Sequence, residues 1–375
     1  MNALQRLWDH GQSVWLDNLS RKMLRDGELA GRVAEEGVRG VTSNPSIFHD
    51  AITKGDDYDE DIARRTAAGA GVRDVYEALA VADVRAACDI LRAVWDESDG
   101  LDGYVSLEVD PHLAHDTDRT LVEARRLSHA VSRDNLLIKI PGTPAGVPAI
   151  REAIFEGISI NVTLLFSIEA YEAVAEAYVE ALERRLEAGR RLDRVISVAS
   201  FFLSRIDTLT DQRLEALRGE VDDREIDSLL GQAAVANAKI AYARFDERIA
   251  GERWRRLAAR GARPQRLLWA STSTKNPAYP DTKYVDPLIG DLTINTMPES
   301  TIQAFLAHGT VADTVRDGRD EAQDVVRRLE AAGIDFAGVT GDLLDEGVAK
   351  FVAPFDALLS TLGERMSALA ASSAS

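Results

Sequence analysis

This sequence of 375 residues is poor in several features that mark particular classes of protein. It has one cysteine, Cys88, which excludes an intramolecular disulfide and gives no support to a metal cluster. Such cysteine usage fits a reducing, cytoplasmic environment. The first residues, MNALQRLWDHGQSVWLD, lack the basic region and apolar core of a secretory signal.

Long apolar runs and an excess of positive charge are also missing. No stretch approaches the roughly 18 apolar residues that a membrane span needs. The net charge of −18 disfavours nucleic acid and anionic membrane surfaces as partners. An anionic metabolite can still bind wherever the chain gathers positive side chains. We find no phosphate-binding glycine loop and no serine nucleophile elbow.

Eight short β-rich or apolar runs recur, and most are followed by a helical pattern, so we expect eight strands. They span residues 13–17, 38–44, 104–110, 135–141, 158–166, 194–200, 266–272 and 292–297. Strands alternating with helices predict a parallel sheet covered by helices, which eight strands close into a (β/α)8 TIM barrel. A doubly wound open sheet is the alternative, but no Gly-x-Gly-x-x-Gly follows a strand.

The chain shows no repeat and no break in composition, so we expect a single barrel domain over residues 1–375. The segments 45–103 and 205–265 are longer than one crossover helix requires, which predicts inserted helices. After about residue 299 the pattern is helical, apart from a weak strand signal at 336–340. We expect the helices from about residue 318 to pack on the barrel and the tail, 367–375, to be disordered.

Polar side chains stand at the ends of seven predicted strands, where a packed core would not need them. Chemistry in such barrels lies at the carboxyl ends of the strands. Any one of these residues could be a helix cap or a turn residue, but together they predict a polar site at one mouth of the barrel. The set comprises Asp17, Asn44, Glu108, Lys139, Asn161, Thr163, Ser200 and Ser271.

Lys139 is the most unusual member, because it lies within the apolar run NLLIKIPG. In one interpretation its side chain reaches from the strand end to water. In the other it is a Schiff-base nucleophile, because apolar surroundings favour a free amine that attacks a ketone or aldehyde. Glu108 and Asp17 are then candidate proton carriers, and Asn44 and Asn161 are candidate ligands for substrate hydroxyls.

Groups suited to an anion follow the sixth and seventh strands. Arg205 comes five residues after Ser200, and its alternative is a surface pair with Asp207 or another acid. The loop after the seventh strand adds Ser271, Ser273 and Lys275. Hydroxyls, a lysine and an arginine together predict a phosphate site. The loop EVDPHLAHDT also carries Asp110, His112, His115 and Asp116, but without a further ligand cluster we interpret it as a solvated loop.

Several blocks of the chain resemble transaldolases, in the order of that family, over about residues 13–306. They are WLDNLSR, GVTSNPSIF, YVSLEVDPHLAHDT, LLIKIPGT, GISINVTLLFS, SVASFFLSRID and WASTSTKNPAYPDTKYVDPLIGDLTINTMPE. The chain is most similar to the longer bacterial form. The resemblance implies transfer of a dihydroxyacetone unit from sedoheptulose 7-phosphate or fructose 6-phosphate to glyceraldehyde 3-phosphate or erythrose 4-phosphate. That is a step of the non-oxidative pentose phosphate pathway, and it needs no metal and no organic cofactor.

The resemblance also implies roles for single residues. Lys139 would form the Schiff base, and Asp17 would take the proton of the C4 hydroxyl as the C3–C4 bond breaks. Glu108 and Thr163 would position a water that relays protons during imine formation. The substrate would be bound by Asn44, Asn161 and Ser200, with Phe202 near the Schiff base and with Arg205 and Ser271 at the phosphate.

One departure from the short form of the family concerns the phosphate site. The short form has an arginine two residues beyond the serine of the seventh strand, where this chain has Ser273. Lys275 is the candidate substitute for the missing charge. Two other functions stay open: a lyase-type Schiff-base aldolase, and a catalytically silent barrel that binds sugar phosphates. A homodimer is one alternative for the oligomeric state.

Overall fold

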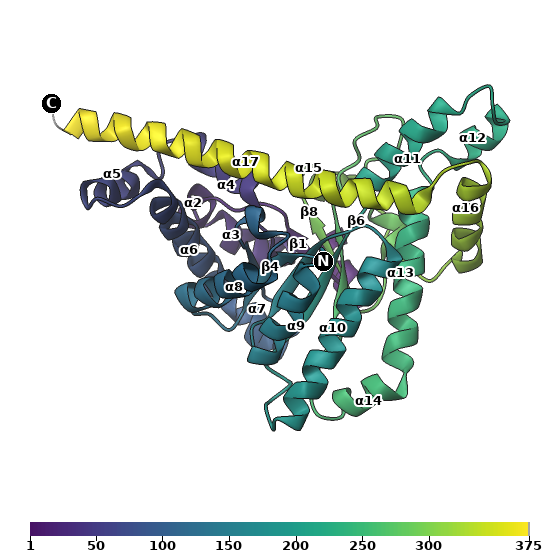
Figure 1. The fold of residues 1–375 in the computed structure, drawn as a ribbon, viewed down its shortest axis with the longest axis horizontal. Helices are drawn as coiled ribbons and strands as arrows, with labels where there is room; N and C mark the ends of the chain where they lie inside the picture. Colours follow the sequence, from purple (N-terminus) through teal and green to yellow (C-terminus); the bar gives the residue numbers. More distant parts are fainter. Residues whose placement is uncertain (374–375) are drawn as a thin grey trace.

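The strands of the barrel are short runs of buried residues, and the computed structural model describes them within residues 1–373 (Figure 1). They pair in parallel and in chain order, and β1 pairs with β8 to close the sheet, which confirms the (β/α)8 barrel. Their bounds are β1 (Gln12–Leu16), β2 (Val38–Val41), β3 (Val105–Glu108), β4 (Leu136–Pro141), β5 (Ile160–Leu165), β6 (Ser197–Phe202), β7 (Arg266–Ala270) and β8 (Thr293–Met297).

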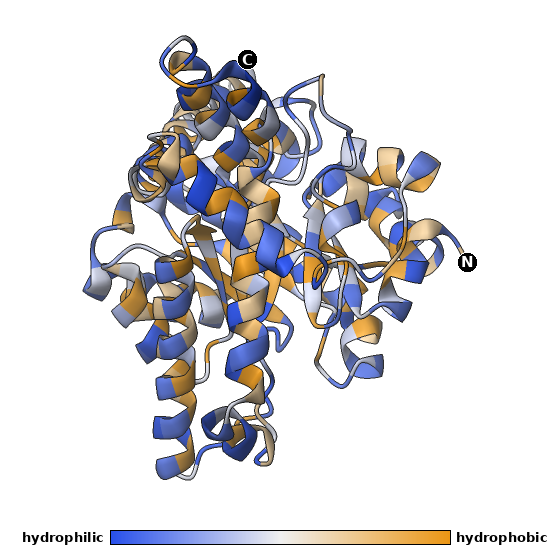
Figure 2. Cartoon of the chain, turned by 90° about the vertical axis from the view of Figure 1, so that its right-hand side faces the viewer, coloured by the Kyte–Doolittle hydropathy of each residue, from blue (hydrophilic) through white to orange (hydrophobic). Residues whose placement is uncertain are grey.

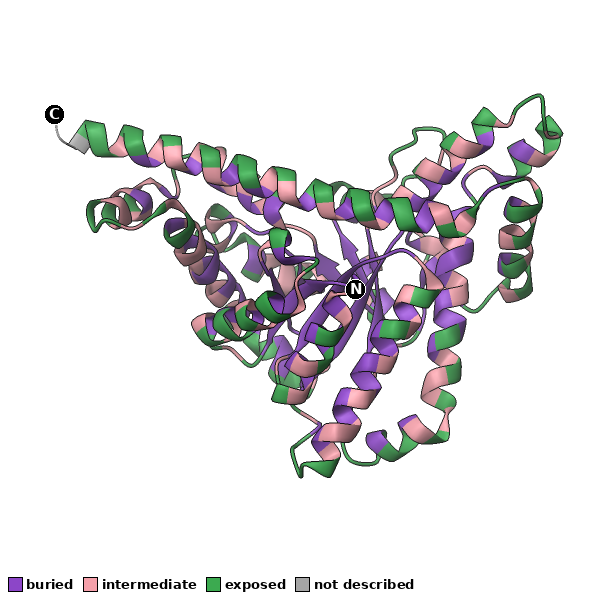
Figure 3. Cartoon of the chain, in the orientation of Figure 1, coloured by how far each residue is buried: buried purple, intermediate pink, exposed green. Residues whose placement is uncertain are grey.

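Burial on both faces explains why these runs are apolar almost throughout. Helices cover the outside of the barrel and side chains fill its inside, so the strands are orange in Figure 2 and purple in Figure 3. The sixth strand lies slightly later than predicted, at 197–202 and not 194–200, because its ladder to β7 begins at Val198. None of the helices within residues 1–373 combines the length and apolar character needed to cross a lipid bilayer.

Helices precede and follow the strands, and the two long segments hold several each, as expected. The first half contains α1 (Ala3–Asp9), α2 (Arg21–Arg25), α3 (Glu28–Gly31), the π-helical η1 (Arg32–Glu36), α4 (Pro45–Thr53), α5 (Asp59–Ala67), α6 (Val72–Ile90), α7 (Arg92–Glu97), η2 (Pro111–Leu113), α8 (Thr117–Val131) and α9 (Gly146–Glu156). The second half contains α10 (Ile168–Glu187), α11 (Ser204–Ala216), α12 (Asp223–Leu229), α13 (Ala233–Ala250), α14 (Glu252–Ala258) and η3 (Asp286–Leu288).

The segment after the barrel is helical and returns across it. It forms α15 (Glu299–His308), α16 (Arg319–Ala331) and α17 (Phe336–Ser373), and the weak strand signal at 336–340 is instead the first turn of α17. Figure 1 shows α17 as a long yellow helix that lies across the top of the barrel. It packs against α4, α5, α6 and α11 and also contacts β5.

The tail differs from the disorder expected over 367–375. Residues up to 373 continue α17, and residues 374 and 375 lie outside the described part of the chain. Two side chains near the end anchor the helix. Met366 is buried, and Arg365 donates through Nη1 to the carbonyl oxygen of Ile52 at 2.7 Å and pairs with Asp59. Both anchors precede residue 367, and most side chains of residues 367–372 are exposed.

A close contact with β5 fixes α17 over the barrel. The register of β5 shifts between Val162 and Leu165, and Leu164 has a φ of 60°, which is uncommon for a residue with a side chain. The Leu164 side chain meets α17 at Gly347, where a Cβ would lie 2.9 Å from Leu164 Cδ2. The missing side chain of Gly347 therefore allows the approach. Phe351 follows four residues later, on the same face of the helix.

Candidate active site

The predicted polar residues meet at the carboxyl ends of the strands, around a cavity of about 200 Å³. Two of them, Glu108 and Asn161, are buried directly beside the cavity, in contact with residues that line it. The others line it: Asp17, Asn44, Lys139, Thr163, Ser200, Phe202, Arg205, Ser271 and Lys275. The residues predicted from the sequence therefore lie together in the structure.

Lys139 and its neighbours occupy one row of the sheet. In the ladders of β3, β4 and β5, Glu108 lies opposite Lys139 and Lys139 lies opposite Asn161. Lys139 Nζ is 3.3 Å from Glu108 Oε2 and donates to the carbonyl oxygen of Ser43 at 3.3 Å. Both the lysine and the glutamate are almost fully enclosed, with side chains 6% and 5% exposed. The interpretation in which Lys139 extends to water is therefore wrong.

Glu108 can change its protonation state near neutral pH. Burial raises its pKa to about 7, Lys139 lowers it in part, and Asp17 raises it further. Apart from the ammonium, neither carboxylate oxygen has a partner among the described residues, and the buried hydroxyl of Thr163 has none either. Buried polar atoms without partners are typical of sites that hold a water or a ligand.

Asp17 follows β1 and is held by Thr42, whose hydroxyl contacts Thr296 in turn. Thr42 donates to Asp17 Oδ1 at 2.7 Å, and the hydroxyls of Thr42 and Thr296 are 2.6 Å apart. The backbone N–H of Asp17 donates to the carbonyl oxygen of Met297 at 2.9 Å. Sequence reasoning missed both threonines, although Thr296 stands at the end of the eighth strand, where the same rule applies.

The two predicted amides, Asn161 and Asn44, make different hydrogen bonds. Asn161 donates to Ser106 Oγ at 3.0 Å and accepts from Ser200 Oγ at 2.6 Å. Asn44 caps α4, because its Oδ1 accepts the N–H of Ile47 at 3.0 Å. The cap interpretation of Asn44 therefore holds, and the same residue also lines the cavity.

Arg205 places a positive charge at the cavity, at the start of α11. Its Nη1 is buried without a partner among the described residues, and burial lowers its pKa. Its guanidinium carbon lies 5.4 Å from the centre of the Phe202 ring. The surface pair with Asp207 does not form, because the buried Asp207 accepts from Ala234 N at 2.7 Å and from Tyr284 Oη at 2.9 Å.

The loop after β7 brings hydroxyls and a second positive charge to the same side. Ser271 has a φ of 55°, and its hydroxyl lies 2.9 Å from that of Ser204. A strained backbone of this kind is common at functional sites. Lys275 is exposed and donates to Ser273 Oγ at 2.6 Å. An anion in the cavity would therefore meet Arg205 from within and Lys275 at the rim.

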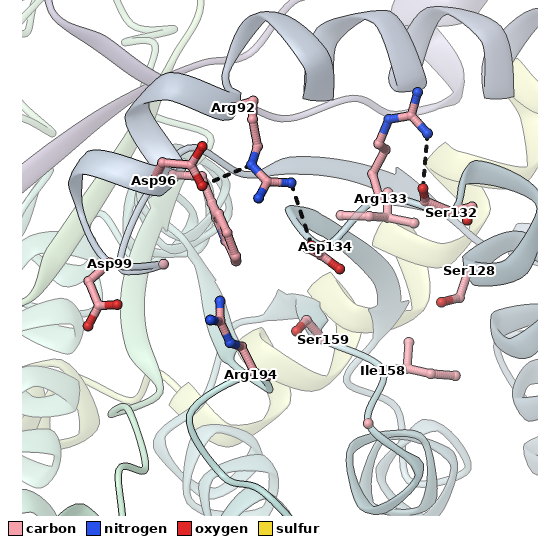
Figure 4. A pocket seen from close by; sticks show the side chains of 14 residues that line it. Arg92, Asp96, Asp99, Ser128, Ser132, Arg133, Asp134, Ile158, Ser159 and Arg194 are labelled. Carbon is pink, nitrogen blue, oxygen red and sulfur yellow. Dashed lines mark hydrogen bonds and ion pairs between the residues drawn. The ribbon is translucent and has the colours of Figure 1, made fainter.

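A larger cavity, of about 710 Å³, lies at the opposite ends of the strands. Figure 4 shows Arg92 there between Asp96 and Asp134, with nitrogen–oxygen distances of 2.9 and 3.5 Å. In this cavity the carboxylates of Asp96 and Asp134 balance the positive charge of Arg92. The amino ends of barrel strands do not usually carry the chemistry. We therefore place the candidate site at the smaller cavity.

The histidine-containing loop after β3 makes polar contacts with neighbouring carboxylates. His112 lies 2.7 Å from Asp110 and 3.2 Å from Asp356 of α17. Within residues 1–373, no three His, Cys, Asp or Glu side chains are arranged to hold a metal ion. The loop thus connects α17 to the barrel.

Comparisons with known proteins give a family and several similar sequences. The family model described as Transaldolase/Fructose-6-phosphate aldolase matches residues 14–362. A protein named Transaldolase from Trichodesmium erythraeum is 46% identical over 374 residues, covering 98% of each chain. A Transaldolase from Thermobifida fusca is 48% identical over 98% of this chain and 99% of its own. Transaldolase 1 from Streptomyces avermitilis is 50% identical over 95% of this chain and 93% of its own.

Proposed function

The chain belongs to the transaldolase/fructose-6-phosphate aldolase family, as an enzyme of the transaldolase class, and we propose that Lys139 carries its reaction. Enzymes of this class are transferases, and membership implies sugar phosphates as substrates. The observation that carries the proposal is the enclosed contact between Lys139 Nζ and Glu108 Oε2 at 3.3 Å. It sets a nucleophile beside a carboxyl group that titrates near neutral pH.

In the first step, the Lys139 amine attacks the ketone carbon of a ketose phosphate, sedoheptulose 7-phosphate or fructose 6-phosphate. The resulting carbinolamine must lose water to become an iminium. Glu108 and Thr163 are suited to hold the water that carries protons in this step, because their buried oxygens have no partner among the described residues apart from the Lys139 ammonium. A carboxyl group with a pKa of about 7 can both give and take the proton.

In the second step, Asp17 removes the proton of the C4 hydroxyl and the C3–C4 bond breaks. The electron pair of that bond moves into the iminium, which leaves an enamine on Lys139 and releases an aldose phosphate. Thr42 holds the Asp17 carboxylate at the required place. Asn44, Asn161 and Ser200 would bind the hydroxyls of the retained unit. An acceptor, glyceraldehyde 3-phosphate or erythrose 4-phosphate, then takes up that unit by the reverse sequence.

Arg205 and Ser271 would bind the phosphate of donor and acceptor, with Lys275 at the rim. The buried Nη1 of Arg205 supports this role, because it has no partner among the described residues and an anionic oxygen would supply one. Phe202 packs against Phe166, with ring centres 5.3 Å apart, and bounds the cavity beside the guanidinium.

Borohydride trapping tests the proposal. The protein is incubated with fructose 6-phosphate, reduced with borohydride, and analysed by mass spectrometry of its peptides. We expect a dihydroxyacetone adduct on the peptide containing Lys139 and no adduct in Lys139→Met. A protein whose mass is unchanged would indicate a silent sugar-phosphate-binding barrel. Cleavage that proceeds equally well without erythrose 4-phosphate would indicate the lyase-type aldolase.

The physiological setting follows from the same proposal. A transaldolase acting on these substrates serves the non-oxidative pentose phosphate pathway, and we place the protein in the cytoplasm, where such metabolites occur. The homodimer stays a prediction. Light scattering on the eluting peak of a sizing column would test it, and a mass near 40.9 kDa would contradict it.

A further inference from the structure

Phe351 of α17 reaches the catalytic lysine from a distant part of the sequence. Its ring centre lies 5.3 Å from Lys139 Nζ, and the residue is 5% exposed. It lines the same cavity as Asp17, Lys139 and Arg205. This aromatic face is therefore part of the wall around the nitrogen that would become the Schiff base.

The position of Phe351 is fixed on both sides along the helix. One turn before it, Gly347 packs against Leu164 of β5. One turn after it, Phe355 packs edge to face against Tyr76 and beside His112, with ring centres 5.4 and 5.9 Å apart. The ring of Phe351 is thus held over the lysine by neighbours that do not line the cavity.

We propose that Phe351 is a specificity-determining residue that keeps water away from the enamine on Lys139, so that the retained unit passes to an aldose acceptor. This inference rests on the proposed Schiff-base function. A buried aromatic ring fills the space above the nitrogen with apolar surface, and its face also suits the positive charge of an iminium. The two groups assigned to the water relay, Glu108 and Thr163, belong to the strands of the barrel and not to α17.

The competing reaction that Phe351 would suppress is hydrolysis. Protonation of the enamine carbon gives an iminium, a water oxygen adds to the iminium carbon, and a proton leaves that water. Breaking the C–N bond then frees dihydroxyacetone and the lysine amine. The sum consumes one water for each dihydroxyacetone released, with no net proton and no change in oxidation state. Because the transfer product also leaves Lys139 by hydrolysis of an iminium, the step that divides release from transfer is protonation of the enamine carbon, and keeping water from that carbon favours transfer.

Partitioning between release and transfer is the measurement that tests this role. Free dihydroxyacetone is assayed from fructose 6-phosphate alone, and transfer is assayed with erythrose 4-phosphate. We expect the ratio of release to transfer to rise at least about tenfold in Phe351→Ala. In Phe351→Leu, which fills most of the same space, we expect a rise of about threefold. Phe355→Ala is the matched control, since Phe355 is equally buried on the same helix and does not line this cavity.

The outcomes separate this inference from the function on which it rests. An unchanged ratio in folded Phe351→Ala, or an equal rise in Phe355→Ala, would overturn the inference, because either result means that α17 acts only by covering the barrel. If Phe351→Ala does not fold, the ratio in Phe351→Leu decides in the same way. Borohydride trapping of the unaltered protein is scored separately, and only the absence of its adduct would overturn the Schiff-base function.

Discussion

At the amino ends of the strands, the buried carboxylate of Asp102 accepts hydrogen bonds from Trp15 Nε1 at 2.8 Å, from Arg39 Nε at 3.1 Å and from Ser13. At the carboxyl ends, the buried carboxyl group of Glu108 has the ammonium of Lys139 and no further partner among the described residues. The two groups lie in the same barrel at similar burial. They differ in whether the surrounding residues complete their hydrogen bonds.

Two arginines repeat the contrast. Arg266, at the amino end of β7, donates to the carbonyl oxygen of Leu101 at 2.6 Å and to Ser13 at 3.1 Å. Arg205, beyond the carboxyl end of β6, has a buried Nη1 without a partner in the part of the chain described. Removing one partner from a buried charge cluster whose bonds are complete destabilises the fold, whereas a buried charge with open bonds can bind a ligand. Substitutions at the two ends should therefore have opposite consequences.

Lys139→Met should show the largest effect, and on activity alone. Removal of the proposed nucleophile should lower the transfer rate on the order of 10⁴-fold or more. Because Glu108 can take up a proton when the ammonium is gone, we expect the free energy of unfolding to change by less than about 2 kcal/mol. A coupled transfer assay and urea denaturation measure the two quantities. Activity within tenfold of the unaltered protein would contradict the assigned role.

Asp102→Ala should show the reverse pattern at the other end of the barrel. It leaves Arg266 and Arg39 without their buried carboxylate, so we expect a loss of about 3–5 kcal/mol in the free energy of unfolding. The turnover rate of the folded fraction should stay within about twofold, because this cluster is remote from the catalytic cavity. A loss of turnover rate as large as the loss of unfolding free energy would contradict the expected difference between the two ends of the barrel.

Glu108→Gln should affect both the rate and its pH dependence. Loss of the proposed proton carrier should lower the turnover rate about 100-fold, and the inflection near pH 7 in the rate profile should disappear. Burial raises the pKa of Glu108 from 4.5 to about 7, so the folded protein binds this proton more tightly than the unfolded chain. Its contribution to stability is complete below pH 4.5 and is lost as the pH rises through 7.

The magnitude of that loss is about 3 kcal/mol, since each pKa unit corresponds to about 1.4 kcal/mol. Burial also raises the pKa of Asp207, to about 6. Asp207 therefore makes the same contribution to the pH dependence of stability in Glu108→Gln and in the unaltered protein. The difference between Glu108→Gln and the unaltered protein therefore isolates Glu108. Parallel curves of unfolding free energy against pH for the two proteins would show that Glu108 has an ordinary pKa.

Substitutions of Arg205 and Lys275 should give the smallest effects. They compare how much each positive charge contributes to phosphate binding. Arg205→Gln should raise the KM for fructose 6-phosphate on the order of tenfold, because it removes a buried donor with an open bond. Lys275→Ala should raise it by about twofold, since an exposed charge is screened by water and salt. Steady-state kinetics at fixed ionic strength measure both. A larger effect at Lys275 would mean that the rim, and not the buried arginine, binds the phosphate.

Local sequence patterns were sufficient to predict the barrel and the gathering of the polar strand ends. The predicted strands are short runs with clear boundaries. Because all parallel strands of a barrel end at the same mouth, polar residues at their ends, such as Asp17 and Lys139, must lie close together. The same rule about strand ends applies to Thr296, which is not among the predicted residues. Such reasoning needs no knowledge of long-range packing.

Other features depended on packing that no local pattern reveals. Phe351 looks like any apolar residue of an amphipathic helix, and its contact with Lys139 depends on where α17 docks. The docking depends in turn on the register shift at Leu164 and on the missing side chain of Gly347. The raised pKa of Glu108 likewise results from burial, which becomes known only when the barrel is complete.

The place of Phe351 in the chain also has a consequence for protein synthesis. A ribosome makes all eight strands, through Met297, before it makes α17. The nascent barrel can therefore assemble with Lys139 in an open mouth, and the covering helix arrives last. Selectivity for transfer over hydrolysis would then be acquired at the end of translation, when α17 docks on a barrel that has already formed.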